Sequence, residues 1–240
     1  MKDKLKDKLR IKDKILNGEV PTLLFFGDSI TEGCFEFNED FSDTTFKPEY
    51  AYPSLLKRDI EDKLGKRINL INAGKSGNNT VKALKRFEND VLAKNPDFVL
   101  IMFGANDVVN IYWKQFDQNT FYKNMKYFID ELRKRNIEIV LMTPNMMAKY
   151  DKGTLVNTKY QETLADCIFL QNNGAVDKFF EDELEFAKNE NVDVIDVYSI
   201  WKKMDKDGID TTALLINDVN HPNYKMQQLF ADEIYKYLFG

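Results

Sequence analysis

Short apolar runs recur along the chain, and they constrain its fold more than any other feature of the sequence. They are strand-length, nearly continuous and rich in Val, Ile, Leu and Phe, and they fall at residues 20–26, 67–71, 98–103, 137–142 and 192–197. Strands that are buried on both faces of a parallel sheet have this composition. The sequence therefore predicts a parallel sheet of about five strands.

Helix-like segments separate these runs. We expect helices at residues 52–64, 81–93, 121–135, 159–189, with a break near Asn172-Asn173-Gly174, and 224–238. Regular alternation of strands and helices is typical of an α/β fold, in which right-handed crossovers place helices on both faces of the sheet. We predict a three-layer α/β/α sandwich that forms a single domain over residues 19–240.

Residues 1–18 differ in character from the rest of the chain. Lys and Asp alternate there around Leu5, Leu9 and Leu16, which fall near one stripe of a helix. The segment is either a helix that meets a membrane surface or a partner, or a charged helical extension that lays its leucines on the domain. The second interpretation is favoured because the segment has no Trp or Phe anchor. The segment also lacks the apolar region of a signal peptide, so we expect a cytoplasmic protein.

Charge and residue counts exclude several classes of function. The chain of 240 residues has 34 basic and 39 acidic side chains, a net charge of −5, which argues against a nucleic-acid partner. Its apolar runs are too short to span a bilayer, so no stable membrane insertion is expected. The only histidine, His221, rules out metal sites built on several histidines, and we expect neither a metal nor an organic cofactor. Cys34 and Cys167 are expected to be reduced, buried thiols.

Small and polar residues follow three of the apolar runs, at the edge of the sheet where α/β proteins bind ligands. The segments are Gly27-Asp28-Ser29-Ile30-Thr31, Asn72-Ala73-Gly74-Lys75-Ser76-Gly77 and Gly104-Ala105-Asn106-Asp107, and Asp218-Val219-Asn220-His221-Pro222 precedes the last helix. Singly, each has an ordinary explanation, such as a helix cap or a turn. Together, four such segments in this order favour a common site.

The four segments resemble the motifs of the SGNH hydrolases, also called the GDSL esterase and lipase family, and the resemblance extends over residues 27–222. The third segment departs slightly, because Ala105 stands where Gly or Thr is more usual. The resemblance implies the flavodoxin-like fold of that family and an ester hydrolase activity. It implies Ser29 as the nucleophile, His221 as the base and Asp218 as the carboxylate that orients it. It further implies an oxyanion hole made by Ser29, Gly77 and Asn106.

These roles agree with the chemistry of the residues. A serine hydroxyl attacks an ester only when a base takes its proton, and a histidine oriented by a carboxylate is such a base near pH 7. The spacing of three residues lets one loop supply both Asp218 and His221. We expect activity to rise between pH 5 and 8 as His221 loses its proton.

Aromatic and sulfur-containing side chains near the same edge predict the walls of a substrate pocket. The predicted substrate-binding residues are Asp28, Phe35, Tyr112, Trp113 and Met146. We expect a small-molecule acyl ester as substrate, with a short acyl chain such as the acetyl group of an O-acetylated carbohydrate. An acyltransferase or a thioesterase would use the same residues, and a catalytically silent ligand-binding relative is the third alternative. The sequence does not predict an oligomeric state.

Overall fold

A five-stranded parallel sheet organises the fold. In the computed structural model, which describes residues 10–240, the strands lie in the order β4–β1–β5–β6–β7. Their bounds are β1 (Thr22–Gly27), β4 (Asn69–Gly74), β5 (Phe98–Met102), β6 (Glu138–Thr143) and β7 (Asp193–Asp196). Every neighbouring pair in this sheet is parallel. The five predicted strands are thus confirmed.

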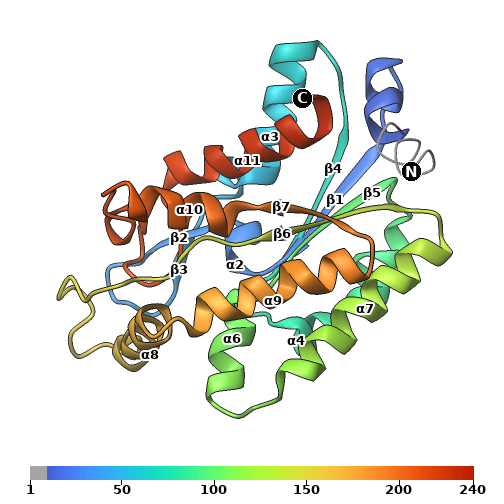
Figure 1. Ribbon diagram of the computed structural model, residues 1–240. Coiled ribbons are helices and arrows are strands. Elements are labelled where there is room, and N and C mark those ends of the chain that lie inside the picture. The colour runs from blue at the N-terminus through green and yellow to red at the C-terminus, as the bar shows by residue number, and fades with distance from the viewer. Residues whose placement is uncertain (1–9) are drawn as a thin grey trace.

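Helices cover both faces of this sheet (Figure 1). One layer contains α3 (Tyr52–Leu64) and α11 (Tyr224–Phe239), which pack against each other. The other layer contains α4 (Thr80–Leu84), α7 (Gln118–Lys134) and α9 (Ala175–Asn189). The three-layer α/β/α sandwich is confirmed.

The structure confirms one of the long helix predictions and contradicts another. The predicted break in residues 159–189 is present, because α8 (Gln161–Asn172) ends before Gly174, whose φ is +81°. The predicted helix at residues 81–93 is instead divided into α4, α5 (Phe87–Asp90) and the 3₁₀ turn η2 (Leu92–Lys94). Arg86 lies at the first break, with a φ of −115°, and its side chain extends to the sheet. The uninterrupted helix was therefore a wrong prediction.

The apolar pattern also missed several elements near the carboxyl edge of the sheet. These are the antiparallel hairpin of β2 (Cys34–Phe37) and β3 (Thr44–Phe46), the helices α2 (Ser29–Glu32), α6 (Ala105–Tyr112) and α10 (Val197–Lys206), and the 3₁₀ turns η1 (Pro48–Tyr50) and η3 (Thr212–Leu214). The strands β2 and β3 and the helix α2 are too short to show a clear period, whereas α6 and α10 are amphipathic helices that the sequence analysis did not identify. The β2–β3 hairpin matters most, because it reaches the site described below.

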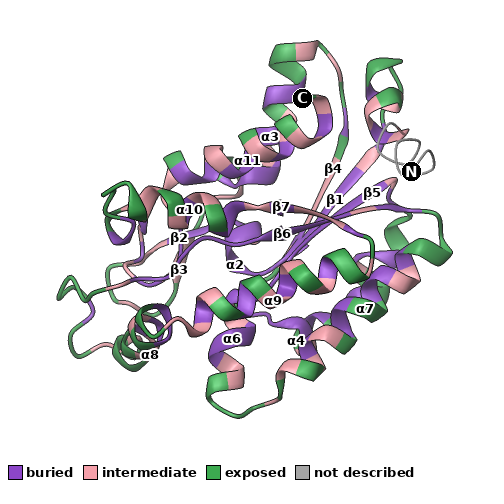
Figure 2. Ribbon diagram, in the orientation of Figure 1, coloured by how far each residue is buried: buried purple, intermediate pink, exposed green. Residues whose placement is uncertain are grey.

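The core lies between the sheet and its two helical layers, and buried residues follow the strands (Figure 2). The ring of Phe26 on β1 packs edge-on against Phe103 and Phe128, with centroids 5.1 and 5.5 Å away. Residues 10–16 form a helix that buries Ile11 and Ile15, whereas Leu16 is 41% exposed. The leucine stripe is thus wrong at Leu16, because two isoleucines occupy the buried face. The predicted positions Leu5 and Leu9 lie outside the described residues.

Candidate active site

The strand order brings the three sequence segments next to one another. β1 lies between β4 and β5, so Ser29, which follows β1, has the segment of Gly77 on one side and that of Asn106 on the other. The loop of His221 enters α11 at the same edge, where the histidine reaches Ser29. Four segments distant in sequence are therefore assembled at one edge of the sheet.

Ser29 and His221 form a hydrogen-bonded pair. The Oγ atom of Ser29 lies 2.9 Å from Nε2 of His221, and each residue is 5% exposed. Ser29 is the first residue of α2, whose N-cap is Asp28, with Oδ1 of Asp28 accepting from the N–H of Ile30. The cap fixes the turn from β1 into α2, and that turn directs the Ser29 hydroxyl out of the sheet edge toward the histidine.

The other nitrogen of His221 meets a main-chain carbonyl of the β2–β3 hairpin. Nδ1 of His221 lies 3.0 Å from the carbonyl oxygen of Phe35. A carbonyl oxygen can only accept, so Nδ1 carries the hydrogen and Nε2 of the neutral ring presents its lone pair. The Ser29 hydroxyl therefore donates to Nε2, which is the arrangement that a general base requires.

Burial sets the acidity of this imidazole. Removal from water lowers the pKa of His221 from 6.5 to about 4, and the hydrogen bond to Phe35 offsets only part of this effect. Burial disfavours the charged imidazolium, and no carboxylate among residues 10–240 hydrogen-bonds to the ring to compensate. The ring is neutral throughout the range from pH 5 to 8. This pKa predicts a rise in activity near pH 4 in place of the rise between pH 5 and 8 expected from the sequence, and the pH dependence stays a prediction.

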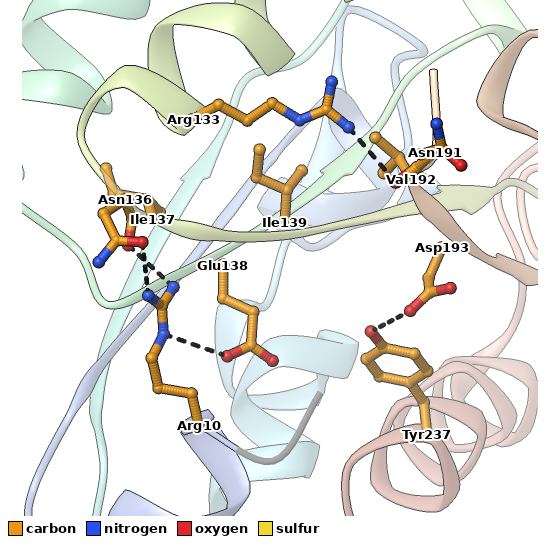
Figure 3. A pocket seen from close by; sticks show the side chains of 10 residues that line it. All are labelled: Arg10, Arg133, Asn136, Ile137, Glu138, Ile139, Asn191, Val192, Asp193 and Tyr237. Carbon is orange, nitrogen blue, oxygen red and sulfur yellow. Dashed lines mark hydrogen bonds and ion pairs between the residues drawn. The ribbon is translucent and has the colours of Figure 1, made fainter. Parts of the chain in front are cut away.

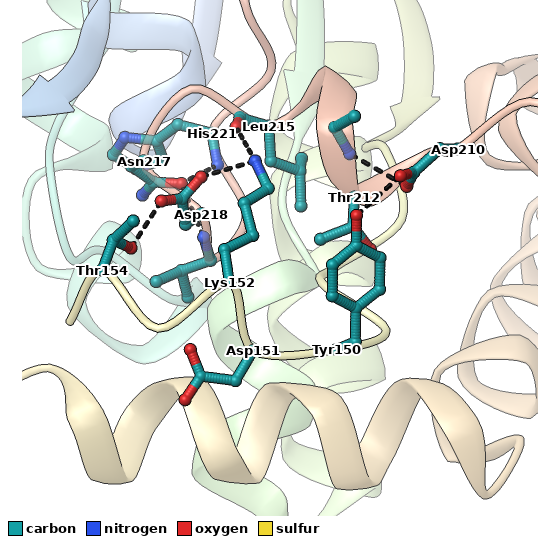
Figure 4. Close-up of polar contacts among 12 residues, drawn as sticks. Tyr150, Asp151, Lys152, Thr154, Asp210, Thr212, Leu215, Asn217, Asp218 and His221 are labelled. Carbon is teal, nitrogen blue, oxygen red and sulfur yellow. Dashed lines mark hydrogen bonds and ion pairs between the residues drawn. The ribbon is translucent and has the colours of Figure 1, made fainter. Parts of the chain in front are cut away.

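Asp218 does not make the predicted contact with His221. Its Oδ1 accepts from Nζ of Lys152 at 2.6 Å, and its Oδ2 accepts from Oγ1 of Thr154 at 2.6 Å (Figure 4). Asp218 has a φ of +61°, so the chain turns sharply between the carboxylate and the histidine. A part-buried ammonium ion and a hydroxyl satisfy both carboxylate oxygens, which explains why the carboxylate lies toward Lys152.

Donors for an oxyanion are present beside Ser29. Within residues 10–240, the main-chain N–H groups of Ser29 and Gly77 donate to no protein acceptor. Gly77 is exposed, has a φ of +67° and lies next to open space, so the main chain is accessible there. Nδ2 of Asn106 donates to the carbonyl of Asn78 at 2.9 Å, which orients the Asn106 amide toward the Gly77 segment.

Two buried carboxyl groups lie behind these donors. Burial, with a smaller effect of the nearby Asp107, raises the pKa of Asp28 to about 7. Burial also raises the pKa of Asp107 to about 6, although Thr80 and Gly104 donate hydrogen bonds to it. Oδ2 of Asp28 lies 3.5 Å from Nδ2 of Asn106. Asp28 is therefore a helix cap and a neighbour of the Asn106 amide. It is 2% exposed, and its contact with substrate stays a prediction.

The other predicted pocket residues divide into two groups. Phe35 and Met146 are 0% and 4% exposed, so both side chains are buried, and their contact with substrate stays a prediction. The ring of Phe35 is covered by Tyr224, with centroids 4.5 Å apart. Tyr112 and Trp113 are 44% and 41% exposed at the end of α6, and their contact with substrate stays a prediction.

The sequence analysis missed two residues whose contacts involve main-chain carbonyl groups, Arg86 and Phe35. Nη1 of Arg86 donates to the carbonyl of Ala73 at 2.7 Å, Nη2 donates to that of Gly27 at 2.9 Å, and Nε donates to Oδ1 of Asn78 at 2.8 Å. Arg86 thus ties the ends of β1 and β4 to the segment of Gly77. Neither this arginine nor the Phe35 carbonyl belongs to a recognisable motif, so no sequence signal identified them.

One described cavity lies away from Ser29. About 220 Å³ in volume, it is lined by Arg10, Arg133 and residues that begin β6 and β7, at the amino ends of those strands (Figure 3).

Residues 10–240 include no cluster of three or more His, Cys, Asp or Glu arranged for a metal ion, and no helix in that range is long and apolar enough to cross a bilayer. Cys34 and Cys167 are both free and buried, as predicted.

The pairing of Ser29 with His221 at the carboxyl edge agrees with the match to a family model. Residues 25–229 match the model of the GDSL-like lipase/acylhydrolase family. The chain belongs to this family. An acetylxylan esterase of Geobacillus stearothermophilus is 38% identical over 150 residues, which are 61% of this chain and 62% of that protein. An isoamyl acetate-hydrolyzing esterase 1 homolog of Rattus norvegicus is 28% identical over 212 residues, 81% of this chain and 72% of the relative.

Solved structures of esterases share the fold. An acetyl xylan esterase superposes with a TM-score of 0.67 at 26% identity, over 91% of this chain and 100% of the other. A two-domain esterase active on acetylated mannans superposes with a TM-score of 0.69 at 23% identity, over 98% of this chain and 53% of the other.

An uncharacterized lipoprotein of Bacillus subtilis is 35% identical over 120 residues. The matched segments span 46% and 62% of the lengths of this lipoprotein and the Geobacillus esterase.

Proposed function

We propose that this protein is a serine-dependent carboxylic ester hydrolase in which Ser29 is the nucleophile and His221 is the general base. The observation that carries the proposal is the 2.9 Å contact between Oγ of Ser29 and Nε2 of His221, on a ring whose tautomer is fixed by the Phe35 carbonyl. Membership of the acylhydrolase family supports it. A cytoplasmic location stays a prediction.

In the proposed reaction, the neutral ring of His221 takes the proton of Ser29 as Oγ attacks the ester carbonyl. The N–H groups of Ser29 and Gly77 and the Asn106 amide donate to the resulting oxyanion. Removal of one such donor typically lowers turnover by about 10²–10³. The imidazolium then protonates the leaving alcohol, and a water molecule activated by His221 releases the acyl group from Ser29. The Phe35 carbonyl holds the Nδ1 hydrogen throughout.

We propose an acetyl ester of a carbohydrate as the substrate class. Two of the similar proteins are named for acetylated xylan, and a structural neighbour is described as active on acetylated mannans. Tyr112 and Trp113 offer exposed rings that suit stacking on sugars. Transfer of the acyl group to an alcohol would use the same residues, and a thioester would enter by the same attack.

Acetate release tests the proposal. Wild type should hydrolyse p-nitrophenyl acetate and release acetate from acetylated xylan, and Ser29→Ala should lower both rates by at least about 10³. Ser199→Ala, at an exposed serine on α10, is the matched control and should keep the wild-type rates. Equal rates for wild type and Ser29→Ala would refute the proposal. Added sugar acceptors distinguish hydrolysis from transfer, because a hydrolase keeps its yield of free acetate.

A further inference from the structure

One buried amide organises the loop that holds the histidine. Oδ1 of Asn217 accepts from three consecutive main-chain N–H groups, those of Val219, Asn220 and His221, at 3.0, 2.9 and 2.8 Å. Asn217 is 4% exposed. In Figure 4 its side chain lies inside the turn that leads to His221. No other side chain among residues 10–240 bonds to the main-chain N–H of His221.

The geometry of the turn explains the need for this acceptor. The positive φ of Asp218 reverses the chain, and the next three N–H groups donate to no main-chain carbonyl among residues 10–240. An unsatisfied buried donor costs about 1–3 kcal/mol. One amide oxygen satisfies all three groups, and Nδ2 of Asn217 donates to Oδ1 of Asn220 at 3.2 Å.

Further hydrogen bonds hold the main-chain carbonyls of the loop. The N–H of Ile216 donates to the carbonyl of His221 at 2.8 Å. From the segment after β6, Nδ2 of Asn145 donates to the carbonyl of Asn220, and the N–H of Ala148 donates to that of Val219. The carbonyls of the loop thus accept from Ile216 and from the segment after β6, and its N–H groups donate to Asn217.

We propose that Asn217 is a positioning residue for His221, and that its amide oxygen sets the place of the imidazole relative to Ser29. The inference rests on the proposed function, because the value of this placement is the transfer of a proton from Ser29. Displacing a catalytic group by about 1 Å can lower a rate by about 10². Among residues 10–240, Asn217 makes no hydrogen bond to Ser29 and acts through the main chain of the histidine loop.

The test replaces the acceptor while conserving volume. Asn217→Leu should lower kcat on p-nitrophenyl acetate by about 10- to 100-fold with little change in KM. Asn217→Asp keeps an acceptor oxygen and should stay within about fivefold of wild type. Asn223→Leu is the matched control. Asn223 caps α11 through its side chain in the same loop, and its loss should cost stability while kcat stays within about threefold of wild type.

A second readout does not depend on activity. His221 is the only histidine, so the Cε1–H group of its labelled imidazole gives a single NMR signal. We expect this signal to move in Asn217→Leu and to stay near its wild-type position in Asn217→Asp and Asn223→Leu. If Asn217→Leu does not fold, Asn217→Ser, with a shorter acceptor, is judged by the same measurements and should lose at least about fivefold in kcat.

Three results would overturn the proposal. The first is an Asn217→Leu enzyme within twofold of wild-type kcat with an unmoved imidazole signal. The second is an Asn217→Asp enzyme as slow as Asn217→Leu, and the third is an Asn223→Leu enzyme as slow as Asn217→Leu. Failure of the proposed function is seen separately, since it appears as full activity of Ser29→Ala. In that event the imidazole signal still decides whether Asn217 places His221.

Discussion

Nδ1 of His221 lies 3.0 Å from the main-chain carbonyl oxygen of Phe35, and this contact occupies the place where a carboxylate was expected. A carbonyl fixes the tautomer of the ring as well as a carboxylate does, because both only accept. A carbonyl has no full negative charge, however, so it stabilises the imidazolium less. The site therefore has a correctly oriented but weakly basic histidine.

This contact predicts the acid limit of activity. Burial lowers the pKa of His221 to about 4, so kcat/KM should rise with pH through about 4 and stay level from pH 5 to 8. Titration of the single imidazole NMR signal should give the same value in the absence of substrate. Lys12→Ala, in the helix at residues 10–16, should leave both curves unchanged. A midpoint at or above 6.5 would contradict the arrangement and would indicate a carboxylate partner.

The variant Asp218→Asn distinguishes orientation of His221 by the Phe35 carbonyl from orientation by the Asp218 carboxylate. Lys152 and Thr154 bind the Asp218 carboxylate, so the variant should weaken the loop contact with Lys152 but keep kcat/KM within about tenfold of wild type. Loss of a carboxylate bonded directly to the base lowers kcat by about 10⁴. His221→Ala is the reference and should lose at least that much. A 10⁴ loss in Asp218→Asn would show that the carboxylate reaches His221 during turnover.

Most of the fold could be predicted because buried parallel strands leave a direct trace in the sequence. Phe98–Met102 is entirely buried and entirely apolar, and its predicted bounds were correct to one residue. The β2–β3 hairpin left no such trace, since β3 is three residues long and partly exposed. The helix at residues 81–93 was wrong because a tertiary contact of Arg86 breaks a segment of continuous helical pattern.

The site was predictable where side chains carry the chemistry. Ser29 and His221, 192 residues apart in sequence, were predicted to meet and do so. Motif spacing fixes only main-chain proximity, and it could not reveal that Lys152 holds the carboxylate of Asp218. The carbonyl of Phe35 has no sequence signature, because every residue has a carbonyl. These contacts depend on which distant segments pack together.

Arg86 should be required for turnover although it lies behind the site. Arg86→Leu would leave the carbonyls of Gly27 and Ala73 without this donor and free the side chain of Asn78, so the ends of β1 and β4 should shift. We expect kcat on p-nitrophenyl acetate to fall by about 10- to 100-fold and the free energy of unfolding to fall by about 2–4 kcal/mol. Arg58→Leu, at an exposed arginine on α3, should change neither. Wild-type kcat in a folded Arg86→Leu enzyme would refute this role.

Glu183 on α9 is a buried acid whose replacement should stabilise the protein. It is 0% exposed, and its carboxyl oxygens have no hydrogen-bond partner among residues 10–240. Burial, with smaller effects of Asp107 and Asp196, raises its pKa well above 4.5. The folded state therefore holds a proton that the unfolded chain releases above about pH 4.5, so this residue makes folding less favourable as pH rises.

Glu183→Met conserves volume and removes the acid, so the free energy of unfolding should rise by about 1–3 kcal/mol at pH 8. The gain should shrink as the pH falls toward 4.5, because Glu183 is then protonated in both states. Urea unfolding at pH 5 and pH 8 measures the difference. Glu181→Met, at an exposed glutamate two residues earlier on α9, should show no comparable gain. A Glu183→Met protein less stable than wild type at pH 8 would contradict this prediction. It would mean that the buried carboxyl group stabilises the folded state at that pH.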